Sequence, residues 1–276
     1  MNKQLRLAIL DMYNGTPNQG MRCIQEIVAR YATTFQVQVF DVRGKAEVPN
    51  IEDFDIFIST GGPGDPRKGD GIWDGAYYAW LDAVWNWNRI ANQPSKYVFF
   101  ICHSFQMACH HFGLGEITER RSMSFGTFPI HMTDKGATDV IFKGLHDPFW
   151  AADFRSYQLI QPDVQRMQEI GAEILALEKI RPHVPLERAI MGMRFSKEMV
   201  AVQFHPEADA DGMLLHFQDE HRKQNILEEH GADKYQNMLR DLKDAEKIEK
   251  TNNTVIPNFL NFAIKNLTTA PELVHS

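Results

Sequence analysis

Short hydrophobic runs alternate with amphipathic stretches along the first 115 residues. Four segments have the length and composition of strands, and turn-forming residues or a helical stretch follow them: 5–10, 36–42, 55–60 and 96–101. Apolar residues recur at helical spacing between or after them, at 21–31, 72–91 and 103–112. Apolar strands that alternate with helices predict an α/β fold, with a doubly wound, mostly parallel sheet and helices on both faces.

The pattern changes after residue 115. Short strand-like runs then lie between turns, at 125–132, 172–180 and 199–205, and we expect them to add strands and hairpins to the same sheet. From residue 213 the chain is dense in charge, and its apolar residues form a narrow helical stripe: Ile226, Leu227, Met238, Leu239, Leu242 and Ile248. We therefore predict an α/β domain over residues 1–212 and a helical C-terminal extension over residues 213–276.

Composition narrows the classes of function. The 276 residues are 43% hydrophobic and 24% charged, as in ordinary globular proteins, and the net charge of −7 offers no basic surface for nucleic acid. No segment reaches the ~18 apolar residues of a membrane span, and none resembles a signal-peptide core. Three cysteines are too few for a disulfide framework. These features indicate a cytoplasmic protein that acts on a small molecule.

The first candidate for chemistry is Cys102, which directly follows the strand at 96–101. Reactive groups collect at the carboxyl ends of parallel strands, and the N-terminus of a following helix favours a thiolate. Cys102 is therefore a candidate nucleophile. Taken alone, the residue fits a buried core cysteine better, because free cysteine is among the most buried residue types.

A candidate base lies in the segment MVAVQFHPE. His205 follows a strand-like run, and Glu207 lies two residues later, on the same side of an extended chain. A thiol nucleophile needs a base, and the base needs an acceptor that orients it. His205 and Glu207 fit these roles, although the motif alone also fits a solvated turn.

Donors for an oxyanion are expected at a third strand end, in STGGPGDP. The backbone N–H groups of Gly62 and of His103, which opens the helix after Cys102, are the candidates. By itself the glycine-rich segment is also typical of a surface turn. Three strand ends that carry a nucleophile, a base and an oxyanion loop together favour acyl chemistry.

The order of STGGPGDP, ICHSFQ and VQFHPE resembles the class I glutamine amidotransferases, over residues 5–210. The middle segment SFGTFPIHMTDKGATDVIFKGL resembles the glutaminase part of the GMP-synthase-like branch. The resemblance implies a glutaminase in which Cys102 attacks the side-chain amide of glutamine and forms a γ-glutamyl thioester. His205 would protonate the ammonia, and Glu207 would orient His205.

The resemblance also implies substrate contacts. Gln106 matches the residue with which the family contacts glutamine. Four further candidates lie in the middle segment or where relatives carry His and Asp: Phe125, Gly126, Arg155 and Tyr157. The family usually has glycines two residues before and two after the nucleophile, where this chain has Phe100 and Ser104.

The sequence also bears on the partner to which ammonia would pass. The sequence has no G-x-x-x-x-G-K-[ST] phosphate loop, so we expect the ammonia to pass to a separate synthetase subunit or to be released. Two alternatives stay open, a stand-alone hydrolase of other γ-glutamyl amides or peptides and a catalytically silent binding scaffold.

We expect no cofactor and no metal, because Cys102 and His103 cannot converge on one ion with residues 109–111 of the same helix.

Four of the five tryptophans lie within residues 73–87. Helical spacing predicts one buried face there, made of Trp73, Tyr77, Trp80, Leu81 and Val84. Tyr78 and Trp87 would point elsewhere, and exposed aromatic side chains are enriched at interfaces. A homo-oligomer is therefore a further hypothesis.

Overall fold

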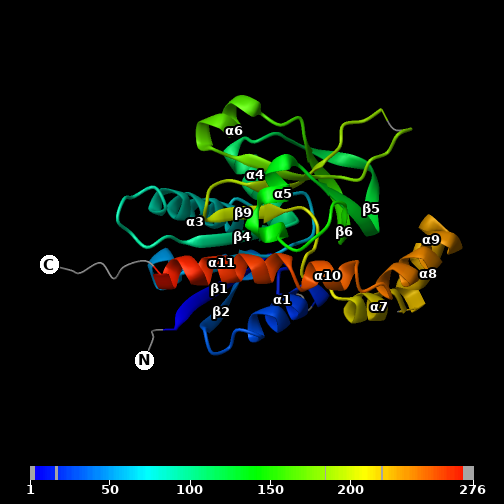
Figure 1. The fold of residues 1–276 in the computed structure, drawn as a ribbon, viewed down its shortest axis with the longest axis horizontal. Helices are drawn as coiled ribbons and strands as arrows, with labels where there is room; N and C mark the ends of the chain where they lie inside the picture. The colour runs from blue at the N-terminus through cyan, green and yellow to red at the C-terminus, as the bar shows by residue number, and fades with distance from the viewer. Residues whose placement is uncertain (1–3, 16–17, 184, 219, 270–276) are drawn as a thin grey trace.

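The computed structural model describes residues 4–15, 18–183, 185–218 and 220–269. The strands of these ranges form one nine-stranded sheet (Figure 1). They are β1 (Leu5–Asp11), β2 (Phe35–Asp41), β3 (Ile56–Ser59), β4 (Tyr97–Ile101), β5 (Glu116–Met132), β6 (Phe149–Ile160), β7 (Glu173–Leu177), β8 (Ile190–Arg194) and β9 (Met199–Val202). The α-helices are α1 (Gln19–Ala29), α2 (Val42–Lys45), α3 (Trp73–Trp87), α4 (His103–Phe112), α5 (Asp134–Thr138), α6 (Val164–Ile170), α7 (Ala210–Gln218), α8 (Glu220–His230), α9 (Ala232–Leu242), α10 (Ile248–Asn252) and α11 (Val255–Thr269). Two 3₁₀ helices are η1 (Ile51–Asp53) and η2 (Val140–Phe142).

The sheet has a parallel and an antiparallel part. Its strand order is β2-β1-β3-β4-β9-β8-β7-β5-β6. The first five strands in this order pair in parallel, and the others pair antiparallel. The predicted α/β fold class is confirmed, and the hairpins expected after residue 115 supply the antiparallel part.

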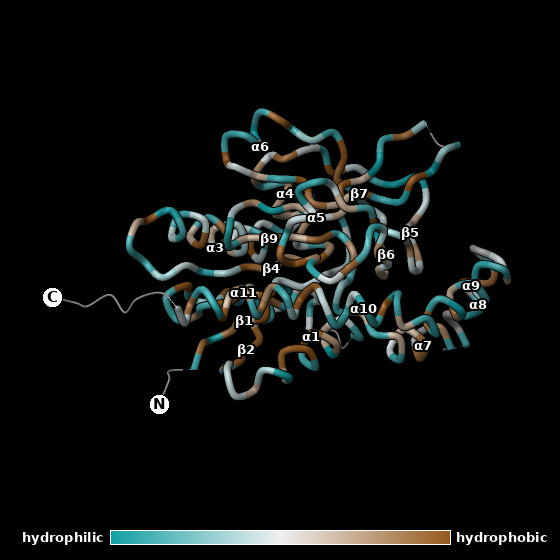
Figure 2. The backbone as a smooth tube through the Cα atoms, viewed as in Figure 1, coloured by the Kyte–Doolittle hydropathy of each residue, from teal (hydrophilic) through white to brown (hydrophobic). Residues whose placement is uncertain are grey.

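Helices cover both faces of the parallel strands, and β4 shows why its sequence is apolar throughout. Alternate side chains of a strand point to opposite faces. Val98 and Phe100 join the hydrophobic cluster under α3 and α4, whereas Phe99 and Ile101 join the cluster under α1 and α11. Figure 2 shows the hydrophobic colour concentrated around β4 and β9 at the centre of the molecule. A strand that is buried on both faces has no position for a polar side chain.

The parallel strands bring four loops to one edge of the sheet. Leu10 of β1 pairs with Ser59 of β3, Ser59 with Phe100 of β4, and Ile101 with Val202 of β9. Because the strands point the same way, the segments that follow them begin side by side. This edge positions the candidate site.

The long hairpin β5–β6 forms the wall next to this edge. Phe125 of β5 pairs with Phe154 of β6. Two residues before Phe154 on β6, Ala152 forms an isolated antiparallel bridge with His205, in the loop after β9. The hairpin is therefore attached directly to the segment that carries the predicted base.

The C-terminal helices pack in two places. Side chains of α7, α8, α9 and α10 form a cluster with Ala152 of β6, and these helices lie at the end of the molecule next to β5 and β6 (Figure 1). Helix α11 instead buries Val255, Ile256, Phe259, Leu260 and Ala263 in the main core. The helical character of the C-terminal segment is thus confirmed, and the domain boundary at residue 213 stays a prediction. Within the described ranges, no helix is both long and apolar enough to cross a membrane.

Helix α3 buries the aromatic face that its spacing predicts, namely Trp73, Tyr77, Trp80, Leu81 and Val84. Tyr78 and Trp87, which the spacing places off this face, also have partners within the chain. Tyr78 stacks on His111 with 4.8 Å between ring centroids, and the Trp87 indole donates to the Pro94 carbonyl at 2.9 Å. Self-association through this helix stays a prediction.

Candidate active site

Cys102 occupies a sharp turn between β4 and α4. Its backbone has φ 49° and ψ −97°, a conformation that L-residues rarely adopt. Two hydrogen bonds hold it: the Cys102 N–H donates to the Val202 carbonyl at 2.8 Å, and the Gln106 N–H donates to the Cys102 carbonyl at 3.0 Å. The strained turn directs the thiol out beyond the end of the sheet, where it lines two cavities.

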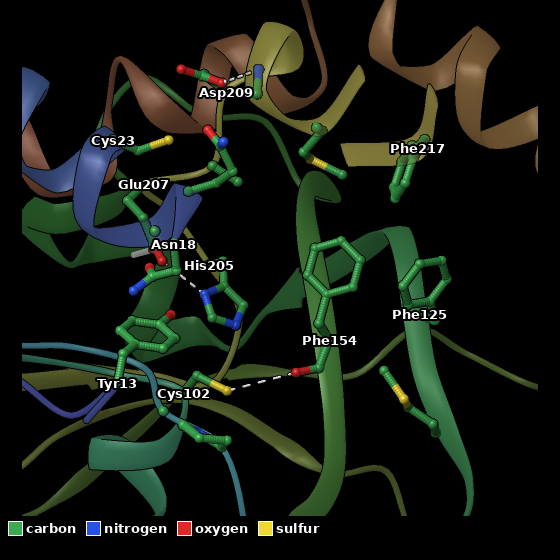
Figure 3. A pocket seen from close by; sticks show the side chains of 18 residues that line it. Tyr13, Asn18, Cys23, Cys102, Phe125, Phe154, His205, Glu207, Asp209 and Phe217 are labelled. Carbon is green, nitrogen blue, oxygen red and sulfur yellow. Dashed lines mark hydrogen bonds and ion pairs between the residues drawn. The ribbon is translucent and has the colours of Figure 1, made fainter. Parts of the chain in front are cut away.

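The three residues of the predicted triad lie together. The Nδ1 atom of His205 is 2.8 Å from Oε1 of Glu207, and His205 lines the same cavity as the Cys102 thiol. Figure 3 shows the ring of His205 between Glu207 and Cys102. The backbone N–H of His205 donates to the Ala152 carbonyl at 2.8 Å, so strand β6 fixes the position of the ring.

The electrostatics of the imidazole suit a proton carrier. Burial disfavours the charged ring and would lower its pKa. The negative charges of Glu207 and Cys102 oppose this effect and outweigh it, so the pKa of His205 is raised well above its usual value. The arrangement therefore favours an imidazolium at His205.

The predicted oxyanion donors lie next to the thiol. Gly62 follows β3, and His103 is the first residue of α4; both line the smaller cavity with Cys102. A Cβ atom on Gly62 would lie 2.6 Å from the Met12 carbonyl oxygen, so only glycine fits there. Neither of the two backbone N–H groups donates to a protein acceptor in the described part of the chain. Both remain available to an oxyanion.

The two departures from the family's glycines are accommodated by the sheet. Phe100 points away from the thiol into the cluster under α3 and α4, edge-on to Phe195 at 5.8 Å between centroids. The Ser104 hydroxyl accepts from the Ile101 N–H at 2.9 Å and donates to the Ser59 carbonyl at 2.7 Å. Ser104 thus ties the ends of β3 and β4 together beneath the turn.

Gln106 reaches the thiol through a second amide that sequence reasoning missed. Its Nε2 donates to Oε1 of Gln203 at 2.8 Å, and Nε2 of Gln203 lies 3.6 Å from the Cys102 sulfur. Gln203 immediately follows β9, two residues before His205. Its position at the carboxyl end of a parallel strand is the signal that would have found it.

Tyr13 is a second residue that sequence reasoning missed. It lies beyond the carboxyl end of β1 and lines the larger cavity with the triad. A Cβ atom on Gly61 would lie 2.7 Å from the Tyr13 hydroxyl and 2.9 Å from Cε1 of His205. Burial and the charge of Glu207 raise the pKa of Tyr13 well above its usual value, so the phenol stays neutral. Its place after the first strand was the available signal.

Two cavities meet at Cys102. The smaller one, of about 310 Å³, is lined by the residues of the thiol turn and of the strand ends around it: Gly62, Pro63, Gly64, Asp65, Cys102, His103, Gln106, Glu119, Met123, Phe154, Arg155, Ser156 and Tyr157. The larger one, of about 560 Å³, lies on the side of His205, and Figure 3 shows Phe125, Phe154 and Phe217 across it from the triad. The thiol therefore faces two cavities that are lined by different residues.

The remaining predicted contacts divide between these spaces. Tyr157 lines the smaller cavity, and Phe125 lines the larger one. Gly126 lines neither within the described residues, because it faces Lys234 and Met238 of α9.

Arg155 borders the smaller cavity, but its side chain is only 1% exposed. The guanidinium pairs with Asp153 at 2.9 Å and with Glu178 at 3.2 Å. This pairing indicates that Arg155 shapes strand β6 and does not reach toward the thiol.

Comparisons with known proteins agree with this geometry. The family model of class I glutamine amidotransferases matches residues 20–215. A search of curated proteins finds no match to the chain.

Solved structures show the same fold. A glutamine amidotransferase from Thermotoga maritima superposes with a TM-score of 0.71 at 12% identity, over 96% of this chain and 100% of its own. A glutamine amidotransferase from Methylobacillus flagellatus gives 0.62 at 15% identity, over 96% of this chain and 94% of its own. The glutaminase domain of Trypanosoma brucei CTPS with bound acivicin gives 0.55 at 14% identity, over 74% of this chain and 86% of its own.

The family model spans more than half of the sequence, and it includes all three motifs that carry the thiol, the imidazole and the glycine loop. The chain therefore belongs to the class I glutamine amidotransferases, the family that its motifs predicted.

Proposed function

We propose that the protein hydrolyses a γ-glutamyl amide, most simply glutamine, with Cys102 as nucleophile, His205 as general acid and base, and Glu207 as the carboxylate that orients the ring. The observation that carries the proposal is the imidazole of His205, which is hydrogen-bonded to Glu207 and lines the same cavity as the Cys102 thiol. This is the constellation that thiol-dependent acyl transfer needs.

The reaction has two halves. The Cys102 thiolate attacks the side-chain carbonyl carbon, and the N–H groups of Gly62 and His103 stabilise the oxyanion. The imidazolium of His205 protonates the amide nitrogen, the C–N bond breaks, and ammonia leaves a γ-glutamyl thioester. Water then gives a proton to His205 and adds to the thioester, and glutamate departs as the thiol is restored.

We place the glutamyl group in the smaller cavity. This cavity contains the two oxyanion donors and Gln106, and it is polar along Asp65, Glu119 and Tyr157. A glutamyl group carries both an ammonium and a carboxylate, so it needs a polar surface with both kinds of partner. Gln106 and Tyr157 remain proposed substrate contacts on this basis.

The nitrogen product has two candidate fates. As an amidotransferase, the chain would pass ammonia to a separate synthetase subunit. As a stand-alone hydrolase, it would release an amine from another γ-glutamyl compound. The larger cavity beside His205 favours the second candidate, because ammonia alone does not require about 560 Å³.

A substrate panel tests the proposal. Purified protein is offered glutamine, γ-glutamyl peptides and γ-glutamyl amines, and glutamate release is measured. We expect turnover that Cys102→Ala abolishes and that Cys109→Ala retains, because Cys109 is fully buried in α4 and lines neither cavity. No turnover of any compound would support a silent scaffold, and turnover by Cys102→Ala at the wild-type rate would refute the assigned nucleophile.

A further inference from the structure

Resting on the proposed function, we propose that the preferred substrate is a γ-glutamyl amide whose amine portion carries an apolar group and no charged group. The apolar group occupies the larger cavity. Glutamine is then a minimal substrate that leaves this cavity unfilled. The proposal assigns a substrate class to the enzyme and a specificity role to helix α7.

The residues that line the two cavities indicate where each half of the substrate lies. His205 and Glu207 line only the larger cavity, whereas His103 and Gln106 line only the smaller one, and Cys102 lines both. The group that protonates the departing nitrogen must lie on the leaving-group side of the reacting carbon. The larger cavity, on the side of His205, is therefore where the amine portion of the substrate resides.

The wall of this cavity is aromatic. The rings of Phe125 and Phe154 lie 5.0 Å apart between centroids, Phe125 and Phe217 lie 5.7 Å apart, and Phe154 and Phe217 lie 6.4 Å apart. Met123 and Met213 extend the same surface. Aromatic and thioether side chains bind apolar groups, and aromatic rings in particular, through dispersion and edge-to-face contacts. Phe154 also lies beside the base, with 6.0 Å between its ring and that of His205.

Charge decides which apolar amine fits. None of the described residues that line the larger cavity is a lysine or an arginine, and its two acids are Glu207 and Asp209. Glu207 accepts from His205, and Asp209 pairs with Arg22 at 2.8 Å. A leaving group with its own carboxylate would meet like charge, and the imidazolium of His205, the cation among the described lining residues, is already paired with Glu207. The cavity therefore favours a simple apolar amine over an apolar amino acid.

The C-terminal helices complete the cavity. Met213 and Phe217 come from α7, which follows the HPE motif, and the Tyr235 hydroxyl of α9 donates to the Phe217 carbonyl at 3.2 Å. Neighbouring side chains of these helices form an apolar cluster with Phe125 and Phe154. Helix α7 is thus supported from behind, so that Phe217 forms a fixed part of the wall.

The chemistry needs no additional reactant. The sulfur of Cys102 bonds to the γ-carbonyl carbon as the C–N bond of the amide breaks, and His205 supplies the proton to the departing amine. Water then hydrolyses the thioester. The products are glutamate and the free amine.

The test compares three substrates on the wild-type enzyme by kcat/KM: γ-glutamyl-phenethylamide, γ-glutamyl-phenylalanine and glutamine. The first two share the same ring and differ by one carboxylate. We expect the phenethylamide to exceed glutamine by about tenfold or more, since a bound ring gains on the order of 1.5 kcal/mol from aromatic contacts. We expect it to exceed γ-glutamyl-phenylalanine as well.

Variants of helix α7 test whether the preference for the phenethylamide depends on the wall of the larger cavity. Phe217→Ala should lower the ratio of phenethylamide to glutamine kcat/KM by about tenfold. Leu215→Ala is the matched control, because Leu215 lies on the same helix, is 66% exposed and lines neither cavity, and it should leave the ratio unchanged.

The outcomes distinguish a failure of the substrate assignment from a failure of the proposed function. A wild-type preference for glutamine would overturn the inference and leave the proposed glutaminase standing, with the cavity serving the transfer of ammonia. A preference for γ-glutamyl-phenylalanine would overturn the charge argument and hence the assigned substrate class. Absence of turnover with all three would overturn the proposed function itself. Because the substrate comparison uses wild-type enzyme, it does not depend on the folding of a variant.

Discussion

The side-chain amide of Asn252 donates a hydrogen bond to the main-chain carbonyl of Glu207 at 2.7 Å. Asn252 closes helix α10 and is only 6% exposed. The adjacent Thr251 donates to the Trp150 carbonyl of β6 at 2.5 Å. Helix α10 therefore holds both the loop of the triad carboxylate and the strand against which His205 is fixed.

This contact predicts that Asn252 is a positioning residue. Asn252→Asp keeps the shape of the side chain and removes the N–H donor, which leaves the Glu207 carbonyl without its partner. Loss of a buried partner costs about 1–3 kcal/mol, and we expect kcat to fall about tenfold with a small change in KM. Steady-state kinetics and urea unfolding measure the two effects separately.

Asn253→Ala is the matched control for this variant. Asn253 is the next residue, and its side chain accepts from Arg30 at the surface, at 2.9 Å. We expect it to keep both kcat and the shape of the pH–rate profile. If Asn252→Asp lost stability but kept the wild-type kcat and pH–rate profile, Asn252 would be a purely structural residue.

Gly61 is predicted to be irreplaceable for activity. An added methyl group would lie 2.7 Å from the Tyr13 hydroxyl and 2.9 Å from Cε1 of His205, closer than van der Waals contact permits. Gly61→Ala should displace the imidazole and lower kcat by about 10²-fold, since small misplacements of catalytic groups have effects of this size. Kinetics of the variant, with its fold checked by circular dichroism, tests this.

Gly75→Ala provides the control for adding a methyl group elsewhere. Gly75 lies inside α3, and a Cβ atom there has no neighbour within 4 Å. We expect unchanged activity and a gain in unfolding free energy of about 0.5–1 kcal/mol, because alanine favours a helix over glycine. Equal activity of the two variants would contradict the steric argument at Gly61.

Ser104→Ala should destabilise the fold. The Ser104 hydroxyl bonds to the Ile101 N–H and the Ser59 carbonyl inside the protein, and both groups would lose their partner. We expect a loss of about 1–3 kcal/mol in unfolding free energy, measured by urea denaturation. Ser95→Ala, whose hydroxyl lies 3.5 Å from Glu198, should change stability by about 0.5 kcal/mol or less. Similar values for the two variants would rule out the proposed tie between β3 and β4.

The sequence predicted those parts of the molecule that depend on local pattern. Strand ends are local, so the apolar runs before Cys102 and His205 were sufficient to place both side chains at one edge of a parallel sheet. Family motifs then predicted which pair would meet. The buried face of α3 followed from helical spacing alone.

The contacts made across long sequence separations could not be read from local pattern. Asn252 lies 45 residues after Glu207, and nothing in its own segment indicates the hydrogen bond between them. Phe217 and Phe125 likewise meet only because α7 packs against the β5–β6 hairpin. The apolar stripe of the C-terminal segment predicted helices, but it did not predict which surface they would cover.

Glu207 is predicted to set the charge of the triad. Burial would lower the pKa of His205, but the Glu207 carboxylate and the interaction with Cys102 raise it well above the usual ~6.5. Glu207→Gln keeps the shape of the side chain and removes its charge, so the pKa of His205 should fall. We expect kcat to fall by about 10³–10⁴, as when other triads lose their carboxylate. Titration of the His205 Cε1 proton by NMR measures the pKa directly.

The raised pKa of His205 makes the free energy of unfolding depend on pH. Because the pKa of His205 is higher in the folded than in the unfolded chain, its protonation stabilises the fold fully below about pH 6.5. That contribution is lost as the pH rises through the folded-state pKa. In Glu207→Gln the loss should occur at lower pH, which urea unfolding across a pH series can follow. Glu246→Gln, a change at a 70% exposed side chain, should leave the profile as in wild type. An unaltered His205 titration in Glu207→Gln would mean that the carboxylate does not control the proton on the ring.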